Sequence, residues 1–302
     1  MAIKMGRAEG TAEVSIDYAK CTSCGLCAIV CKDNTLSLKD KKVVIDQNNW
    51  LGCMACGHCM AICPSGAIAV NGRDFSLSDM VDLPPKELKA SFEQFQALLI
   101  SRRSIREFSS KEVDSEVIRK ILEATSTAPM GIPPSDVGVI VFDTRDKMSA
   151  LKKDIIEILK GWKKSMSPFM LSIMGIFMGR DTIDMLRTFV LPLANSLVEA
   201  DEKGKDYLFY DAPLGMYFYS SVSSDSADPV IASTYAMLTA ESLGLGSCMI
   251  GTVPPSFKQS KKLKEKYGVP PKSHEGMMVI FGYPKIHFKK AIKRRFADVK
   301  FV

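Results

Sequence analysis

The sequence predicts an α+β protein made of two domains. Eight of the nine cysteines fall within a short N-terminal region as two copies of one spacing, and runs typical of short β-strands flank them. From residue 91 onward, segments with helical periodicity alternate with short apolar runs that are typical of strands. The chain therefore combines a small cysteine-rich domain with a larger domain of helices and strands.

Length and composition support this division. With 302 residues, of which 46% are apolar and 25% charged, the chain is long for one core and sufficient for two. We expect a first domain at 1–72, a linker at 73–90 and a second domain at 91–302. Residues 1–10 contain no apolar run that could form a signal-peptide core, which favours the cytoplasm. The most apolar stretch, 168–178, is too short to span a bilayer, so we expect no membrane association.

The cysteine spacing indicates a metal centre. Both runs read C-x2-C-x2-C-x3-C, and without a secretory context a disulfide framework explains them poorly. Zinc sites usually use C-x2-C pairs separated by a longer spacer, whereas three cysteines in one tight loop suit three corners of an iron-sulfur cube. Zinc and a metal-free domain stay as lesser alternatives. The two runs are Cys21, Cys24, Cys27 and Cys31, and then Cys53, Cys56, Cys59 and Cys63.

In this arrangement the fourth cysteine of each run is a ligand of the other cluster. We therefore expect one 4Fe-4S cluster to be held by Cys21, Cys24, Cys27 and Cys63, and the other by Cys53, Cys56, Cys59 and Cys31.

Residues 13–72 resemble the bacterial two-cluster ferredoxins. Pro64 follows the last cysteine, as in that family, whereas Lys32 follows Cys31 and departs from the family pattern. The segments EVSIDY, KKVVID and AIAV are expected to form the flanking strands. The resemblance implies a ferredoxin-type domain whose two clusters carry one electron at a time.

A polar segment with paired prolines separates this region from the first long helix. Ser91 and Gln94 form a Ser-x-x-Gln capping box, and Phe92, Phe95 and Leu99 recur at helical spacing. This pattern predicts a helix that leads directly into the segment SRRSIR.

The segment 101–106 places three guanidinium groups and two hydroxyls within six residues. This chemistry suits a phosphate and polyol tail, although an exposed basic helix end is an equal interpretation of the segment alone. A second basic run, 289–295, is interpreted as a solvated face, an anion site for a cofactor or a nucleic-acid patch. No nucleic-acid-binding motif accompanies it, so we expect no nucleic-acid partner.

Further elements follow in order. Asp114 precedes a predicted helix, with Val117, Ile118, Ile121 and Thr125 on one face. The segment APMGIPPSD leads into a predicted strand, VGVIVF.

Asp228-Pro229 begins another predicted helix, with Ile231, Tyr235 and Leu238 on its face, which ends in GLGSCMIG. A late strand, GMMVIFGYP, follows.

This order of motifs, from RRSIR through GLGSCMIG to the late basic pair, resembles the FMN-dependent nitroreductase family over residues 91–302. The resemblance implies an FMN-binding domain with a central, mostly antiparallel sheet flanked by helices. It also implies a homodimer with FMN near the subunit interface.

Carried over by position, the resemblance implies four groups of FMN-binding residues. Arg102, Arg103, Ser104 and Arg106 would hold the phosphate and ribityl chain, and the late pair Arg294 and Arg295 would join them there. Pro129, Met130 and Gly131 match a loop near the flavin, and Gly246, Ser247, Cys248 and Met249 match the segment after the long helix. We interpret the Cys248 thiol as a small core group rather than a reactive one. No protein side chain is expected to act as a catalytic residue, because the flavin carries the chemistry.

Residues 150–200 fit the family poorly. The Met-rich segment 165–195 is interpreted as ordinary core, a dimer arm or a lid over the flavin.

Three functions follow from this organisation. In the leading hypothesis an external low-potential donor, such as a ferredoxin, reduces the clusters, and FMN passes electrons to a nitro, quinone or similar small-molecule acceptor. In the second, NAD(P)H reduces FMN and the clusters carry electrons outward to a partner. In the third, the protein is a non-enzymatic electron carrier or redox sensor.

Overall fold

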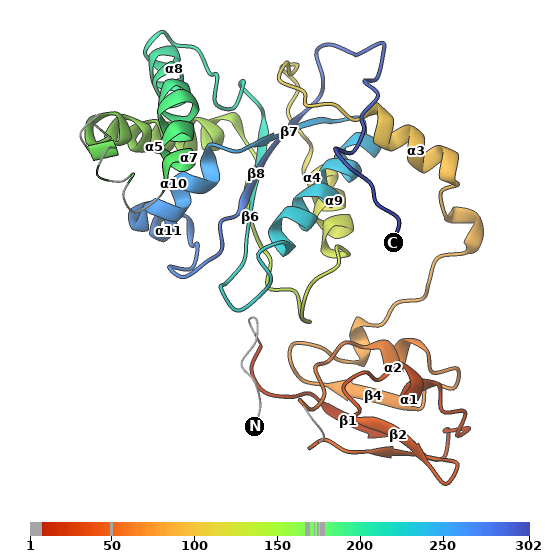
Figure 1. The fold of residues 1–302 in the computed structure, drawn as a ribbon. Helices are drawn as coiled ribbons and strands as arrows, with labels where there is room; N and C mark the ends of the chain where they lie inside the picture. Colours follow the sequence, from red (N-terminus) through yellow and green to blue (C-terminus); the bar gives the residue numbers. More distant parts are fainter. Residues whose placement is uncertain (1–7, 49–50, 167–169, 172, 174, 176–178) are drawn as a thin grey trace.

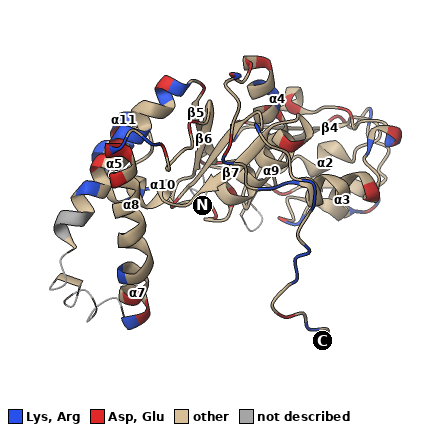
Figure 2. Cartoon of the chain, turned by 90° about the horizontal axis from the view of Figure 1, so that it is seen from above, with Lys and Arg blue, Asp and Glu red and all other residues tan. Residues whose placement is uncertain are grey.

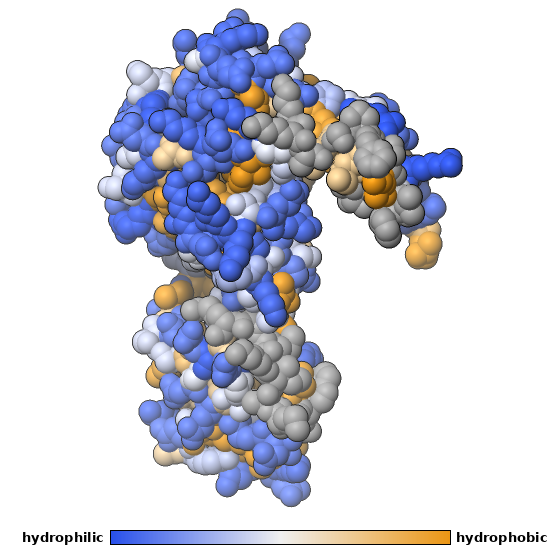
Figure 3. Space-filling model, turned by 90° about the vertical axis from the view of Figure 1, so that its left-hand side faces the viewer, coloured by the Kyte–Doolittle hydropathy of each residue, from blue (hydrophilic) through white to orange (hydrophobic). Residues whose placement is uncertain are grey.

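The chain folds into two lobes of unequal size. The computed structural model describes residues 8–48, 51–166, 170, 171, 173, 175 and 179–302. The small lobe is N-terminal and lies below the larger lobe in Figure 1, and Figure 3 shows the two lobes meeting at a narrow waist. Within the described residues, no helix is long and apolar enough to cross a membrane.

The small lobe has two pairs of antiparallel strands and two short helices. β1 pairs with β4, and β2 pairs with β3. Three of these strands are the predicted ones, whereas β2 is a strand that the sequence patterns missed. The elements are β1 (Glu13–Ile16), α1 (Leu26–Val30), β2 (Leu36–Lys39), β3 (Lys42–Ile45), α2 (His58–Ala61) and β4 (Ile68–Asn71).

An exposed connection joins the lobes. It contains two single turns of 3-10 helix, η1 (Leu77–Asp79) and η2 (Lys86–Leu88), and Val81 and Leu83 are exposed between them. Helix α3 (Phe92–Ser101) follows, and at its N-cap residue Ser91 both hydrogen bonds of the predicted capping box are present.

The larger lobe is built on a four-stranded antiparallel sheet with the strand order β5-β6-β8-β7. This arrangement confirms the predicted fold class. Its elements are α4 (Ser115–Ser126), β5 (Gly138–Phe142), α5 (Arg145–Ser165), α7 (Arg180–Met185), the π-helical turn η3 (Leu186–Val190), α8 (Leu191–Glu202), β6 (Leu214–Tyr219), α9 (Asp228–Ser242), β7 (Gly246–Ile250), α10 (Val253–Gln259), α11 (Lys261–Tyr267) and β8 (Met277–Gly282).

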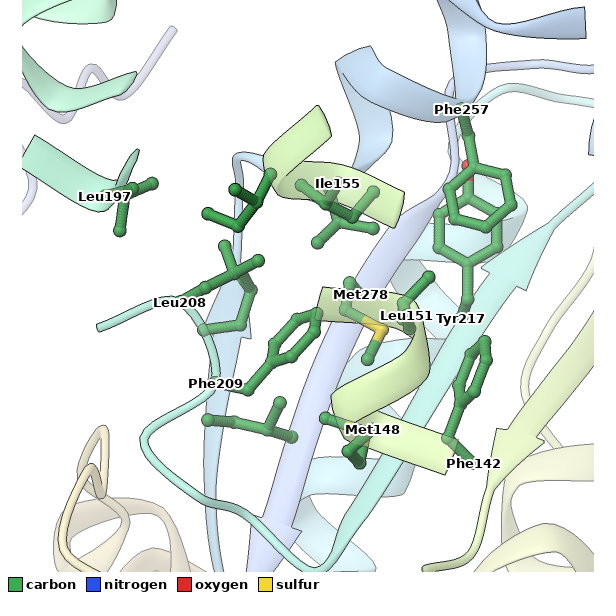
Figure 4. Packing of buried hydrophobic residues seen from close by; sticks show 14 of the residues in the cluster. Phe142, Met148, Leu151, Ile155, Leu197, Leu208, Phe209, Tyr217, Phe257 and Met278 are labelled. Carbon is green, nitrogen blue, oxygen red and sulfur yellow. The ribbon is translucent and has the colours of Figure 1, made fainter. Parts of the chain in front are cut away.

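Helices cover both faces of this sheet (Figure 1). Side chains alternate along a strand, so in β6 Met216 and Phe218 face α4 and α9, while Tyr217 faces the opposite core. That opposite core, built with α5, α8, α10 and α11, packs Leu151, Ile155 and Phe257 around Tyr217 (Figure 4). Burial of each such side chain contributes about 1.5–3 kcal/mol, so both faces stabilise the sheet.

The buried face of α9 differs from the predicted one. The apolar residues Ile231 and Leu238 are only half-buried, and Tyr235 is exposed. Beyond Asp228 and Pro229 at its start, the buried positions are instead Ala232, Ser233, Ala236, Met237 and Ala240. Small side chains allow α9 to approach α4 and the sheet closely. The face of α9 that carries them is therefore buried, and the face with the bulkier side chains is not.

The Met-rich segment is described only in part. Residues 167–169, 172, 174 and 176–178 lie outside the described residues, so its three interpretations stay open there. Farther on, Phe189 is exposed within η3, whereas Leu197 of α8 is buried in the core.

Candidate functional site

The eight cysteines of the small lobe surround two separate cavities. Cys21, Cys24, Cys27 and Cys63 line one cavity. Cys31, Cys53, Cys56 and Cys59 line the other. Each cavity thus takes three cysteines from one run and the fourth from the other run, which is the grouping that the crossed ligand sets predict.

The two runs repeat the same backbone conformation. Ser23 and Ala55 each have a φ of 58°, and the glycines two residues later, Gly25 and Gly57, each have a φ of 74°. Positive φ values are uncommon for residues other than glycine. Their repetition at equivalent places bends each loop tightly enough to bring three cysteines to one cavity, with the third on the short helix that follows.

The thiols of each set are close enough to affect one another electrostatically. Burial raises the pKa of Cys59 to about 12, and Cys53, Cys56 and Cys31 add to that rise. Burial likewise raises the pKa of Cys27, with contributions from Cys63 and Cys24. Four thiolates in such a place require positive charge between them, which a metal cluster supplies.

A single metal ion is a different case, because it needs its ligands around one point. No group of three or more His, Cys, Asp or Glu side chains among the described residues is arranged to hold one ion.

The arginine-rich segment lies along the edge of the sheet beside β7. Ile105 donates its backbone N–H to the Ser247 carbonyl at 3.0 Å, and Ser104 and Ser247 form a parallel β-bridge. Farther along, Lys285 donates its backbone N–H to the Glu107 carbonyl at 2.9 Å. The structure therefore brings two of the predicted FMN-binding groups, 102–106 and 246–249, side by side.

The arginines of this segment do not share one face. Ile105 is buried against Gly246, whereas its neighbours Ser104 and Arg106 are exposed. In an extended segment alternate side chains point to opposite sides, so Arg102, Ser104 and Arg106 form one face. Arg103 and Ile105 lie on the other face, and both line a cavity.

That cavity has a volume of about 450 Å³ and is bordered by the C-terminal tail. Lys289 and Lys290 line it together with Arg103, and Glu241 is the acidic residue in its wall. Burial raises the pKa of Glu241, and the positive charge of Arg102 opposes that rise. The two lysines belong to the basic run noted in the sequence, but their position beside Arg103 could not be read from spacing.

Ser247 and Cys248 lie on the edge strand β7 and differ in whether their polar atoms have partners. Both residues are buried, and the Ser247 hydroxyl is among the described polar atoms that have no hydrogen-bond partner. A buried hydroxyl without a partner beside an arginine-rich segment suits a polar ligand. The Cys248 thiol donates to the Met249 carbonyl at 3.4 Å and packs in the main core, as its interpretation as a core group requires.

The loop 129–131 lies at the opposite end of α9 from this segment. The Gly131 backbone N–H donates to the Asp228 carboxylate at 3.1 Å, at the start of α9, whereas Gly246 follows the end of that helix. α9 has 15 residues, and at 1.5 Å per residue it is roughly 22 Å long. One chain therefore does not bring Pro129, Met130 and Gly131 to the arginine-rich segment.

The late pair Arg294 and Arg295 lies in the C-terminal tail. Figure 2 shows this tail leaving the body of the larger lobe, with Lys and Arg positions along it. Both arginines are exposed. Among the cavity-lining residues on this side, the tail contributes members up to Ala291. The pair therefore lies beyond the part of the tail that lines the cavity of Arg103.

Comparison with known proteins identifies both lobes. Residues 99–283 match the family model of the nitroreductase family, which covers more than half of the chain. The chain belongs to the nitroreductase family. Residues 20–67 match a 4Fe-4S dicluster domain. The predicted order, a dicluster iron-sulfur domain followed by a nitroreductase domain, is confirmed.

A relative of known name agrees with this assignment. The NAD(P)H FMN reductase of Bacillus subtilis (strain 168) is 28% identical over 157 residues, which are 51% of this chain and 53% of the relative. The chain thus spans about half the length of that curated relative.

Solved structures share the nitroreductase fold. One is a nitroreductase with bound FMN from Desulfitobacterium hafniense DCB-2, which is 20% identical with a TM-score of 0.50 and covers 69% of this chain and 97% of its own. Another is a nitroreductase with bound FMN from Bacteroides fragilis NCTC 9343, which is 18% identical with a TM-score of 0.52 and covers 69% of this chain and 98% of its own.

Proposed function

We propose that this protein is an iron-sulfur flavoprotein oxidoreductase, with two 4Fe-4S clusters in the small lobe and FMN in the larger one. The observation that carries the flavin assignment is the bond between Ile105 and Ser247, which joins the arginine-rich segment to the edge of the sheet. The same assignment is supported by membership in the nitroreductase family and by the unpartnered hydroxyl of Ser247.

Different residues of the chain have different roles in the proposed flavin site. The half-buried Arg102 and the exposed Ser104 and Arg106 form one face of the segment and would bind the phosphate and ribityl chain through charge-assisted hydrogen bonds. Gly246 has no side chain, which allows Ile105 to pack against the strand and fixes the segment in place. FMN supplies the redox chemistry when bound, and the protein supplies position and electrostatics.

The cysteine sets would each hold one cluster, with Cys63 and Cys31 as the crossed fourth ligands. Such clusters accept and release one electron at a time. An external low-potential donor would reduce them, and the electrons would pass through FMN to a nitro, quinone or similar acceptor.

We further propose that two chains complete each flavin site. The loop 129–131 and the arginine-rich segment lie at opposite ends of α9, so a second copy is needed to bring such a loop to the segment. Apolar side chains support an interface here, because Phe92 and Phe95 of α3 and Phe288 and Ile292 of the tail are exposed.

A second function is favoured by the curated relative, whose name includes NAD(P)H. In that scheme NAD(P)H reduces the flavin, and the clusters carry electrons outward.

One experiment separates these schemes. The protein is purified without oxygen and its iron, sulfide and FMN are measured. Flavin reduction is then followed by stopped flow with reduced ferredoxin or NADH as donor. About eight irons and one FMN per chain support the cofactor assignment. Fast reduction by ferredoxin that disappears in a Cys24→Ala, Cys56→Ala chain with FMN still bound supports the leading scheme. Fast reduction by NADH that survives in that chain supports the second.

A further inference from the structure

Arg73 occupies a turn position that disfavours arginine. It follows β4 in a tight turn in which Gly72 and Phe75 exchange backbone hydrogen bonds of 2.9 and 3.1 Å. The two central residues, Arg73 and Asp74, have φ values of 54° and 56°. Turns with two positive φ values strongly prefer Asn and Gly. An arginine held in this conformation indicates that its side chain has a use that offsets the backbone strain.

The side chain of Arg73 is buried and bonds to both lobes. It is only 6% exposed. Within the small lobe its guanidinium donates to the carbonyls of Gly10 at 2.7 Å and Ala8 at 3.3 Å. It also donates to the Pro133 carbonyl of the larger lobe at 3.0 Å. All three acceptors are backbone atoms, which the planar guanidinium fork can bind in one fixed geometry.

Pro133 lies next to the loop 129–131. This is the loop that the proposed function places near the flavin of a second chain. The connection between the lobes, by contrast, is exposed and contains only two single turns. A connection of this kind keeps the lobes near one another but does not select one orientation.

We propose that Arg73 is the positioning residue that fastens the cluster domain to the flavin domain at the Pro133 loop. This positioning role rests on the proposed function, because Arg73 would hold the clusters at a fixed distance from the flavin. Each reduced cluster would give up one electron, and two such electrons with two protons from water would fully reduce one FMN. The electrons come from an external one-electron donor protein.

Substitutions of Arg73 that suit the conformation of the turn test this proposal. Arg73→Asn suits the two positive φ values and removes the guanidinium, so the small lobe should keep its fold and its iron. Arg73→Lys keeps the positive charge but not the three-way fork. Arg119→Asn is the matched control, because Arg119 is exposed and pairs only locally, with Glu116 on the same helix, in the bonds that the structure shows.

Three measurements on the chain of residues 1–302 test the proposed role of Arg73. Arg73→Asn should speed amide hydrogen exchange at residues 8–12 and 131–137, increase the radius of gyration, and slow cluster-dependent flavin reduction by roughly tenfold or more. Arg73→Lys should fall between it and the wild type. Unchanged exchange and radius in both Arg73 variants would overturn the proposal.

Loss of iron from Arg73→Asn would also count against it, because Arg73 would then serve the small lobe itself. A separate result tests the proposed function. If wild-type clusters do not reduce the flavin but the variants still loosen the lobes, the fastening role stands and the electron path fails.

Discussion

Ile105 donates its backbone N–H to the carbonyl of Ser247 across 3.0 Å, and the side chain of Ile105 packs where any side chain at position 246 would have to lie. This pair joins two motifs that are about 140 residues apart in the sequence. The position of the arginine-rich segment, and hence of the flavin phosphate in the proposed site, depends on that junction.

Substitution of Gly246 by alanine should weaken flavin binding. An added Cβ would overlap the side chain of Ile105, and overpacking of this kind costs about 1–3 kcal/mol. We expect the Kd for FMN to rise by about tenfold for each 1.4 kcal/mol that reaches the site. Flavin fluorescence titration of the apoprotein measures this change. The control is Gly251→Ala, because a Cβ at Gly251 meets open space. Equal affinities for both variants would contradict the role of the junction.

The alternation of side chains along 102–106 predicts unequal effects of its arginines. Arg102→Ala and Arg106→Ala remove guanidinium groups from the face opposite Ile105 and should raise the Kd for FMN. A hydrogen bond to a charged group contributes about 1.5–3 kcal/mol, so each change should exceed roughly tenfold. Arg103→Ala should have a smaller effect, since Arg103 faces the cavity beside Lys289 and Lys290. A larger loss with Arg103→Ala would place the phosphate in that cavity instead.

The crossed cysteine sets predict which substitutions remove the same cluster. Cys63→Ala should lose the cluster that Cys24→Ala loses, and Cys31→Ala the one that Cys56→Ala loses. Each variant should retain about four of eight irons per chain. The electron paramagnetic resonance spectrum of the reduced protein identifies the surviving cluster. Uncrossed ligation is the correct description if Cys63→Ala instead shares the spectrum of Cys56→Ala.

A flavin site shared between two chains predicts complementation in mixed dimers. One chain carries Cys24→Ala and Cys56→Ala, and the other carries Arg102→Ala and Arg106→Ala. The intact arginines of the first chain then meet the loop and clusters of the second, so one site should show cluster-dependent flavin reduction under stopped flow.

The reversed pairing is the control for this experiment. All four substitutions are placed in one chain, which is paired with a wild-type chain. No site then has both its arginines and its neighbouring clusters, so reduction should be lost. Activity only in the reversed pairing would show that each chain reduces its own flavin.

Asp228 predicts a pH-dependent stability. Burial raises the pKa of Asp228, the Gly131 N–H opposes that rise, and the charges of Asp225 and Asp136 add to it. A raised pKa in the folded state gives stability that is present below the unfolded pKa and is lost as the pH rises through the folded pKa.

Asp228→Asn should therefore gain stability relative to the wild type as the pH is raised from about 4 to 7. Thermal unfolding of the flavin domain at several pH values measures the difference. Asp146→Asn, at an exposed position in the first turn of α5, is the matched control for loss of one carboxylate. A constant difference between wild type and Asp228→Asn would contradict the prediction.

Local signals in the sequence predicted most of the elements. The cysteine spacing, the capping box at Ser91 and the strand runs each depend on residues a few positions apart. The structure has the corresponding elements at those places. The strand β2 was missed because it is four residues long and only one of them, Leu36, is buried.

Properties set by tertiary packing could not be predicted in this way. The buried face of α9 is chosen by the closeness of α4 and the sheet, which favours alanines over the bulkier residues of the opposite face. The polar neighbours of Arg73 predict a linker at this position, yet the side chain of Arg73 is buried between the lobes. Likewise, no sequence spacing reveals that α9 separates Gly131 from Gly246.

The crossed cysteine sets of the small lobe make its two runs depend on one another. Its two runs have the same cysteine spacing, but each cavity takes three cysteines from one run and one from the other. A chain that kept only one run would have three cysteines for one cavity and one for the other. Loss of either run would therefore leave both cavities without a complete set of four cysteines, so the two runs form one structural unit.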